Sequence, residues 1–100
     1  MEFSGKKVTV VGTGISGIGA VGLLNAVGAE VVLYDGNEKL KIEDIEKKLG
    51  TYKAEIVLGE LTKELTDSSD LLVISPGVPI DSRVVKAFEA AGVPIWGEVE

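Results

Sequence analysis

Short apolar runs rich in β-branched residues recur along this chain and alternate with stretches of helical pattern. The five runs, of which the last is the weakest, are Lys6–Val11, Glu30–Tyr34, Ala54–Leu58, Leu71–Ser75 and Val93–Gly97. Continuous apolar runs of this length are typical of strands that are buried on both faces of a parallel sheet. The segments between them predict helices at Ile15–Val27, Glu43–Leu49, Thr62–Thr66 and Arg83–Ala91.

The order of these elements restricts the fold to a few topologies. Strands that alternate with helices predict a doubly wound α/β domain, because parallel neighbours need a crossover between them. We therefore expect a Rossmann-like, five-stranded parallel sheet flanked by helices, with right-handed crossovers. The length of 100 residues suits a single domain, residues 1–100, and the apolar content of 45 % suits one core.

Composition excludes several classes of function. The chain has no cysteine and no histidine, which removes disulfides, thiolate nucleophiles and the commonest general base. Its net charge of −6 argues against a nucleic-acid partner, because such binding relies on clustered lysine and arginine. The sequence contains neither an 18-residue apolar run nor a secretory signal pattern. We expect a cytoplasmic protein without a membrane partner.

A glycine-rich turn follows the first predicted strand and opens the first predicted helix. Gly12, Gly14 and Gly17 form the pattern G-x-G-x-x-G. In a β-α-β unit the first glycine permits the tight turn, the second lets a pyrophosphate approach the backbone, and the third lets the helix pack closely on the strand. The amides of Ile15, Ser16 and Gly17 would then face an anion. The alternative is a tight turn with a purely structural role.

An acidic residue ends the second predicted strand. Asp35 lies eighteen residues after Gly17, where a carboxylate can reach a donor on a ribose or a base. Alternatively, Asp35 caps the turn that follows it, a common role for this residue type. The acid and the glycine turn together are equally compatible with NAD and with another nucleotide.

The loop after the fourth predicted strand contains Ser75, Pro76 and Gly77. Pro76 restricts Ser75 to extended conformations, and Gly77 allows a ligand to approach closely. If the first and fourth strands are neighbours, this loop faces the glycine turn across the position where open α/β sheets bind ligands. Its amides would form a second lip for a phosphate, although the same residues could form a simple turn.

Four stretches together resemble the N-terminal domain of the Mur ligases, and most of all the branch that adds D-glutamate. They cover the chain from end to end and read "VVGTGISGIGA", "VVLYDGNEK", "DLLVISPGVP" and "AAGVPIWGEVE". The resemblance implies that a UDP-sugar is bound by Gly14, Ile15, Ser16 and Gly17 along its diphosphate, by Asp35, Gly36 and Asn37 around its uridine, and by Ser75, Pro76 and Gly77 from the opposite wall. Some relatives carry Thr or Arg where this chain has Gly36 and Asn37, so any contact from Gly36 must come from its backbone.

The same resemblance implies a function in peptidoglycan synthesis. The domain would bind the UDP moiety of UDP-N-acetylmuramoyl-L-alanine for an ATP-dependent ligase that adds D-glutamate. ATP, Mg²⁺ and D-glutamate would be held by other domains, because the 100 residues contain no G-x-x-x-x-G-K-[ST] loop. We therefore expect no catalytic residue, metal or cofactor in this domain. The alternatives are an NAD-binding domain of an oxidoreductase or sensor, the same domain of another Mur ligase, or an interaction module without a working site.

One charged stretch invites a metal site. Glu43, Asp44 and Glu46 gather on a predicted helix, but Lys47 and Lys48 follow them directly. We interpret this stretch as a solvated helix face with ordinary charge pairs.

Overall fold

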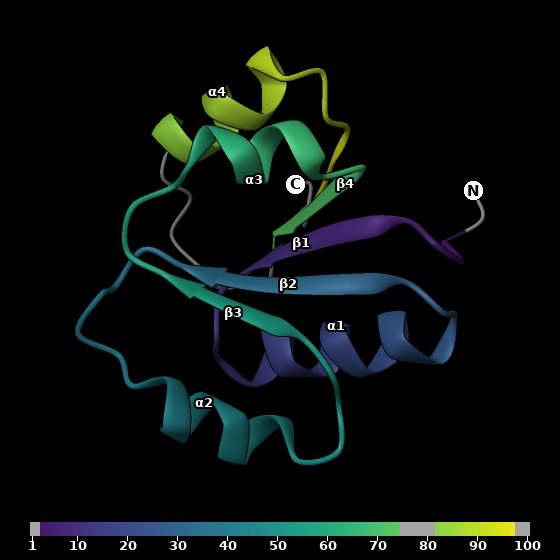
Figure 1. Ribbon diagram of the computed structural model, residues 1–100, viewed down its shortest axis with the longest axis vertical. Helices are drawn as coiled ribbons and strands as arrows, with labels where there is room; N and C mark the ends of the chain where they lie inside the picture. The colour runs from purple at the N-terminus through teal and green to yellow at the C-terminus, as the bar shows by residue number, and fades with distance from the viewer. Residues whose placement is uncertain (1–2, 75–81, 98–100) are drawn as a thin grey trace.

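The computed structural model describes residues 3–74 and 82–97 and has the predicted architecture (Figure 1). Its elements, in chain order, are β1 (Lys7–Val11), α1 (Ile15–Ala26), β2 (Glu30–Asp35), α2 (Ile42–Leu49), β3 (Glu55–Leu58), α3 (Lys63–Ser68), β4 (Leu71–Ile74), α4 (Ser82–Ala90) and β5 (Ile95–Gly97). The five strands form one sheet in the order β3-β2-β1-β4-β5, and every pair is parallel. The expected Rossmann-like fold is therefore confirmed.

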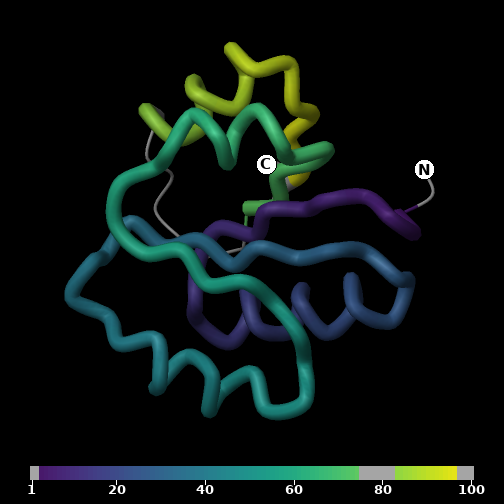
Figure 2. Tube along the Cα trace, viewed as in Figure 1, coloured from purple at the N-terminus to yellow at the C-terminus, as the bar shows by residue number. Residues whose placement is uncertain are grey.

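Two layers of helices cover the sheet. In Figures 1 and 2, α1 and α2 lie below the sheet and α3 and α4 lie above it. The chain thus crosses from one face to the other between α2 and α3. Since β1 and β4 are neighbours while α1 and α4 lie on opposite faces, the point where the strand order reverses lies between these two strands.

Alternating side chains of the strands divide the core into two parts. In β2, Val31 and Leu33 pack against α1 and α2, whereas Val32 and Tyr34 pack against α3 and α4. This is the two-residue period of a strand that is buried on both faces. Each fully buried aliphatic side chain contributes roughly 1.5–3 kcal/mol, so both layers of helices are needed for stability.

Several element boundaries differ from the predicted ones by one or two residues, among them the end of the third helix. The third helix was expected to end at Thr66, with a loop at residues 67–70, but α3 continues to Ser68. The helix begins at Lys63, one residue after the predicted start, and Thr62 is its N-cap, because the Thr62 side chain accepts a hydrogen bond from the Leu65 amide at 3.3 Å. The two extra residues are stabilised by Ser69, whose hydroxyl donates to the Leu65 carbonyl at 2.7 Å and contacts the buried Thr9 hydroxyl at 2.7 Å.

Gly22 and Asn25 of α1 connect this helix to the segment that leads into β3. A Cβ atom at Gly22 would lie 2.6 Å from the Tyr52 ring, so the glycine makes room for this aromatic side chain. Asn25 forms two hydrogen bonds with the backbone of Lys53, at 2.9 and 2.6 Å. Among residues 3–74 and 82–97, no helix has the length and apolarity that a membrane crossing requires.

Candidate functional site

The glycine turn lies at the carboxyl end of β1, in the middle of the sheet. Gly12 has a φ of 109°, which strongly favours glycine, and its amide donates to the Tyr34 carbonyl at 2.8 Å. Gly14 differs, because its φ of −76° and ψ of −174° are open to any residue. A Cβ atom at Gly14 would meet nothing within 4 Å. The packing of the chain itself therefore does not require glycine at this position.

Helix α1 begins without a cap. Its N-cap residue is Gly14, which offers no side-chain hydrogen bond, and its first turn has no acidic residue. The first intrahelical bond is donated by Ile18, to the Gly14 carbonyl at 3.0 Å. In the described part of the chain, the amides of Ile15, Ser16 and Gly17 have no hydrogen-bond partner. This helix end therefore presents unpaired donors and the positive end of the helix dipole.

Asp35 lies beside this turn and is held by two hydrogen bonds. The Thr13 hydroxyl donates to its Oδ2 atom at 3.0 Å, and the Asn37 amide donates to its Oδ1 atom at 3.0 Å. The second bond is the turn-capping role that the sequence left open as an alternative. Each carboxylate oxygen still has a lone pair to offer a ligand, since each accepts only one of these bonds.

Thr13 is the residue that sequence reasoning missed. Its side chain is 7 % exposed and connects the glycine turn to Asp35, so the two predicted halves of the site are joined directly. Its position in the motif could have identified it, because the first variable residue of G-x-G-x-x-G lies next to the end of the second strand. A hydroxyl at that position is suited to hold the acid.

The residues after Asp35 form a second turn. The Asn37 side chain accepts a hydrogen bond from the Lys39 amide at 3.0 Å through its Oδ1 atom. Gly36 is exposed, and a Cβ atom added to it would approach only the Tyr34 hydroxyl, at 3.6 Å. The side-chain oxygen of Asn37 is therefore engaged locally, and its NH₂ group is the part that can reach outward.

The third predicted segment, Ser75, Pro76 and Gly77, lies outside the described residues. The strand that leads to it is described up to Ile74, which pairs with Val11 at the end of β1. The structure thus brings together the glycine turn and Asp35, and it provides no test of the predicted opposite wall.

A cavity of about 370 Å³ opens beside Gly36, on the face of the sheet that carries α4. Its lining combines Tyr34, Gly36, Gly59, Glu60 and Leu61 with Arg83, Val84 and Ala87. The Tyr34 hydroxyl donates to the Gly59 carbonyl at 2.6 Å, which fixes the ring that forms one side of this cavity. A hollow of this size at the carboxyl end of β2 has the place and the mixed lining of a small-molecule site.

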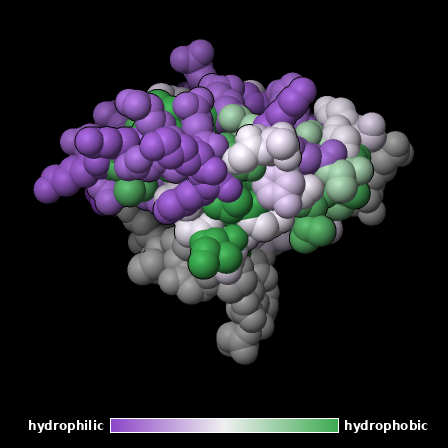
Figure 3. Space-filling view, turned by 90° about the horizontal axis from the view of Figure 1, so that it is seen from below, coloured by the Kyte–Doolittle hydropathy of each residue, from purple (hydrophilic) through white to green (hydrophobic). Residues whose placement is uncertain are grey.

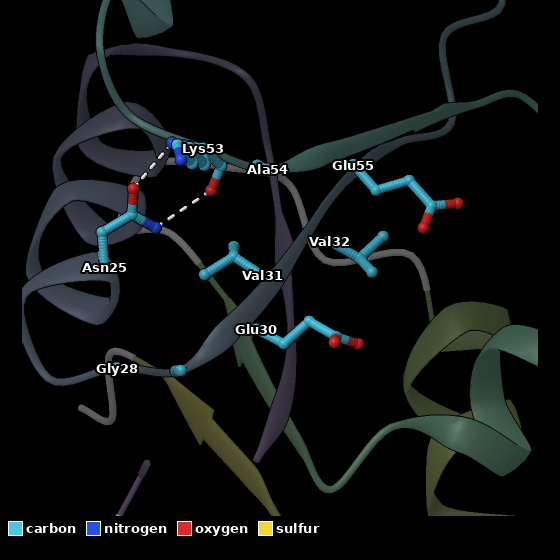
Figure 4. A pocket seen from close by; sticks show the side chains of 9 residues that line it. Asn25, Gly28, Glu30, Val31, Val32, Lys53, Ala54 and Glu55 are labelled. Carbon is cyan, nitrogen blue, oxygen red and sulfur yellow. Dashed lines mark hydrogen bonds between the residues drawn. The ribbon is translucent and has the colours of Figure 1, made fainter. Parts of the chain in front are cut away.

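A different hollow, of about 500 Å³, lies at the amino ends of β2 and β3. Figure 4 shows the Asn25 side chain turned toward Lys53 on one side of it, and the carboxylates of Glu30 and Glu55 extending away from Asn25. Its polar side chains thus include the pair that fastens α1 to the segment before β3. In doubly wound sheets ligands bind at the opposite, carboxyl end, so we assign this hollow a structural role.

Solved structures with the same fold include several dehydrogenases. D-lactate dehydrogenase from Escherichia coli matches with a TM-score of 0.63 at 20 % identity, covering 97 % of this chain and 29 % of that one. Shikimate dehydrogenase from Aquifex aeolicus matches with a TM-score of 0.62 at 16 % identity, covering 96 % of this chain and 43 % of that one. Identities this low establish the fold alone. The chain is thus a Rossmann-like α/β domain with a glycine turn at the reversal point of its sheet.

The sequence narrows this class to one family. Residues 6–97 match the family model for the Mur ligase MurD-like, N-terminal domain, and the chain belongs to this family. The UDP-N-acetylmuramoylalanine–D-glutamate ligase of Lachnospira eligens is 60 % identical over the whole chain, and that of Lachnoclostridium phytofermentans is 52 % identical. The chain spans 22 % of the length of each relative. The resemblance drawn from the sequence motifs is confirmed.

Proposed function

We propose that this chain binds the UDP portion of UDP-N-acetylmuramoyl-L-alanine, as the N-terminal domain of a ligase that adds D-glutamate in peptidoglycan synthesis. The observation that carries the proposal is the uncapped start of α1, where the unpaired amides of Ile15, Ser16 and Gly17 adjoin the empty space at Gly14. Membership of the MurD-like family supports a UDP-sugar over NAD as the anion that fills this space.

The diphosphate would lie along the start of α1. Its oxygens would accept hydrogen bonds from the three amides and gain from the helix dipole, which suits a chain with a net charge of −6. The Ser16 hydroxyl is exposed and can add a further donor. A diphosphate close to Gly14 also explains why no side chain stands there, since a Cβ atom would occupy the approach of the phosphate.

The uridine would lie beyond Asp35. The carboxylate, oriented by Thr13 and the Asn37 amide, can accept a hydrogen bond from a ribose hydroxyl or from the N–H of uracil. The cavity beside Gly36 is large enough for the base, and Gly36 offers it backbone without a side chain. Ser75, Pro76 and Gly77 would form the opposite wall, as the family resemblance implies.

The contribution of this domain would be positioning. With the nucleotide fixed, the alanine carboxylate of the substrate would extend toward the rest of the ligase, where ATP, Mg²⁺ and D-glutamate would be held. The residues of this chain do not fit Mg-ATP. The sequence has no P-loop, and the described residues contain no group of three or more acidic side chains that could hold a metal ion. We therefore assign no chemical step to this domain.

An amide-resolved NMR titration tests the proposal. UDP-N-acetylmuramoyl-L-alanine, UDP and NAD are added in parallel to the ¹⁵N-labelled chain. We expect the uridine ligands to shift the amides of Ile15, Ser16 and Gly17 together with those of residues 35–37, and we expect NAD to leave them unchanged. Shifts with NAD alone would contradict the proposal and support a dinucleotide-binding domain. The absence of shifts with all three ligands would also contradict it.

A further inference from the structure

A third cavity, here called the lysine pocket, lies between α2 and the loop that precedes it. It has a volume of about 510 Å³ and is lined by Thr13, Lys39, Leu40, Lys41, Asp44, Ile45, Lys47 and Lys48. Figure 3 shows this face of the molecule, where hydrophilic side chains gather over α2 and hydrophobic patches lie toward α1. The volume falls in the range of small-molecule sites.

The charge of the lysine pocket is opposite to that of the chain. Four of the ten basic residues line it, against one acidic residue, Asp44, although the net charge of the chain is −6. The other described cavities of comparable size each combine a single basic residue with at least one acidic residue. Such a concentration of cations around one hollow attracts anions.

The four ammonium groups are also unpaired. Glu43, Asp44 and Glu46 are close along the chain, and we expected them to pair with Lys47 and Lys48. The face is exposed to solvent as expected, but within the described ranges none of the lining lysines forms an ion pair. Two of the lysines, at positions 39 and 41, also precede the N-terminus of α2, where the helix dipole disfavours positive charge. All four lysines are exposed to solvent, and a bound anion would give them a partner.

The lysine pocket is separate from the proposed uridine site. The cavity beside Gly36 faces α4, whereas the lysine pocket faces α2, on the other side of the sheet. Thr13 lies between the two regions, and its hydroxyl hydrogen is already donated to Asp35. The lysines therefore provide a binding surface that a nucleotide beyond Asp35 would leave free.

We propose that the lysine pocket binds a phosphate-bearing small molecule that carries at least two negative charges. Its lining contains four lysines, and lysine binds phosphate as a point charge. Its lining contains no aromatic side chain on which a nucleobase could stack, which argues against single-stranded nucleic acid. This proposal does not depend on the UDP site.

The test uses inorganic pyrophosphate as the probe and succinate as a dicarboxylate control, both at constant ionic strength. The amides of residues 39–48 report the lysine pocket, and those of Ile15, Ser16 and Gly17 report the glycine turn. We expect pyrophosphate to shift the first group, also when the chain is saturated with UDP. Because the two groups are read separately, failure of the UDP proposal does not affect this result. An unmoved first group, or an equal response to succinate, would overturn the proposal.

A matched pair of double variants locates the charges. Lys47→Gln with Lys48→Gln removes two lysines of the pocket, and glutamine preserves helix propensity. Lys63→Gln with Lys86→Gln makes the same change of charge on α3 and α4, across the sheet. We expect the first variant to bind pyrophosphate ~25-fold more weakly, at about 5-fold per charge, and the second less than ~2-fold more weakly. Equal losses in both variants would overturn the assignment to this pocket.

Discussion

Gly12 and Gly14 belong to one motif, yet the structure uses them for different reasons. Gly12 adopts a positive φ that allows β1 to turn into α1, so the fold itself demands glycine. Gly14 has ordinary backbone angles and open space where a side chain would stand. A glycine that neither its conformation nor its neighbours require is best explained by something that approaches from outside. At the scale of single residues, Gly14 is therefore the most informative position.

Replacing Gly14 with alanine separates folding from binding. We expect Gly14→Ala to leave the free energy of unfolding nearly unchanged, because its Cβ atom meets nothing in the chain. Crowding of the phosphate by a methyl group costs roughly 1–3 kcal/mol, so the affinity for UDP should fall by about 5- to 150-fold. Calorimetric titration with UDP and urea unfolding measure the two quantities.

Gly19 provides the matched control for this substitution. A Cβ atom at Gly19 also meets nothing within 4 Å, but Gly19 lies on the exposed side of α1, one turn after the site. Gly19→Ala should stabilise the chain by about 1 kcal/mol through helix propensity and leave UDP binding intact. Equal UDP affinities of the two variants would argue against a phosphate at Gly14.

At the scale of elements, α1 differs from α2 and α3 in how it begins. Helix α2 carries Glu43 and Asp44 in its first turn, and α3 has the Thr62 cap and Glu64. In both helices, residues of the chain itself thus offset the positive dipole or the unpaired amides of the N-terminus. Helix α1 has neither a side-chain cap nor an acidic residue in its first turn, which is consistent with an external anion at its N-terminus.

The cap of α3 can be tested by itself. Thr62→Ala removes the side-chain oxygen that accepts the Leu65 amide and should lower the free energy of unfolding by about 1 kcal/mol. Thr62→Ser keeps this oxygen and should stay close to the parent chain. Urea unfolding followed by circular dichroism measures both. A loss of similar size in the serine variant would show that the threonine methyl group, and not the cap, matters.

The sequence was sufficient for the order and type of the elements because each strand is a continuous apolar run. It also pointed to Asp35, since the spacing from the glycine turn is a property of the fold. The predictions from sequence failed where contacts between distant residues determine the structure. The last turn of α3 depends on Ser69, which contacts the Thr9 hydroxyl 60 residues away. The unpaired lysines around α2 depend on side-chain placement, which local charge patterns do not specify.

At the scale of the whole molecule, the sheet is held between two separate clusters of buried side chains. One joins the strands to α1 and α2, and the other joins them to α3 and α4. Phe88 of α4 is completely buried in the second cluster and is among its largest side chains. The two clusters share only the strands. A substitution that destabilises one layer of helices therefore affects the other layer through the sheet.

Truncating Phe88 tests the assignment of the second cluster. Phe88→Ala should cost roughly 3–5 kcal/mol, a large part of the ~5–15 kcal/mol that stabilises a typical domain. Urea unfolding followed by the fluorescence of Trp96, the only tryptophan of the chain, and by circular dichroism measures the loss. Ile42→Ala, at a side chain that is 48 % exposed, is the control and should change stability by less than ~0.5 kcal/mol. A comparable loss in both variants would contradict the assigned core.

The central position of β1 has a consequence for how the chain is made. Val8 pairs with Leu71, so one edge of the first strand stays unpaired until a residue 63 positions later has been synthesised. At about 5–20 residues per second, this interval lasts roughly 3–13 s during synthesis. During that time β1, α1 and β2 can assemble, but the side of β1 that β4 will occupy remains open to other chains. The newborn protein is therefore most vulnerable to aggregation before its fourth strand emerges.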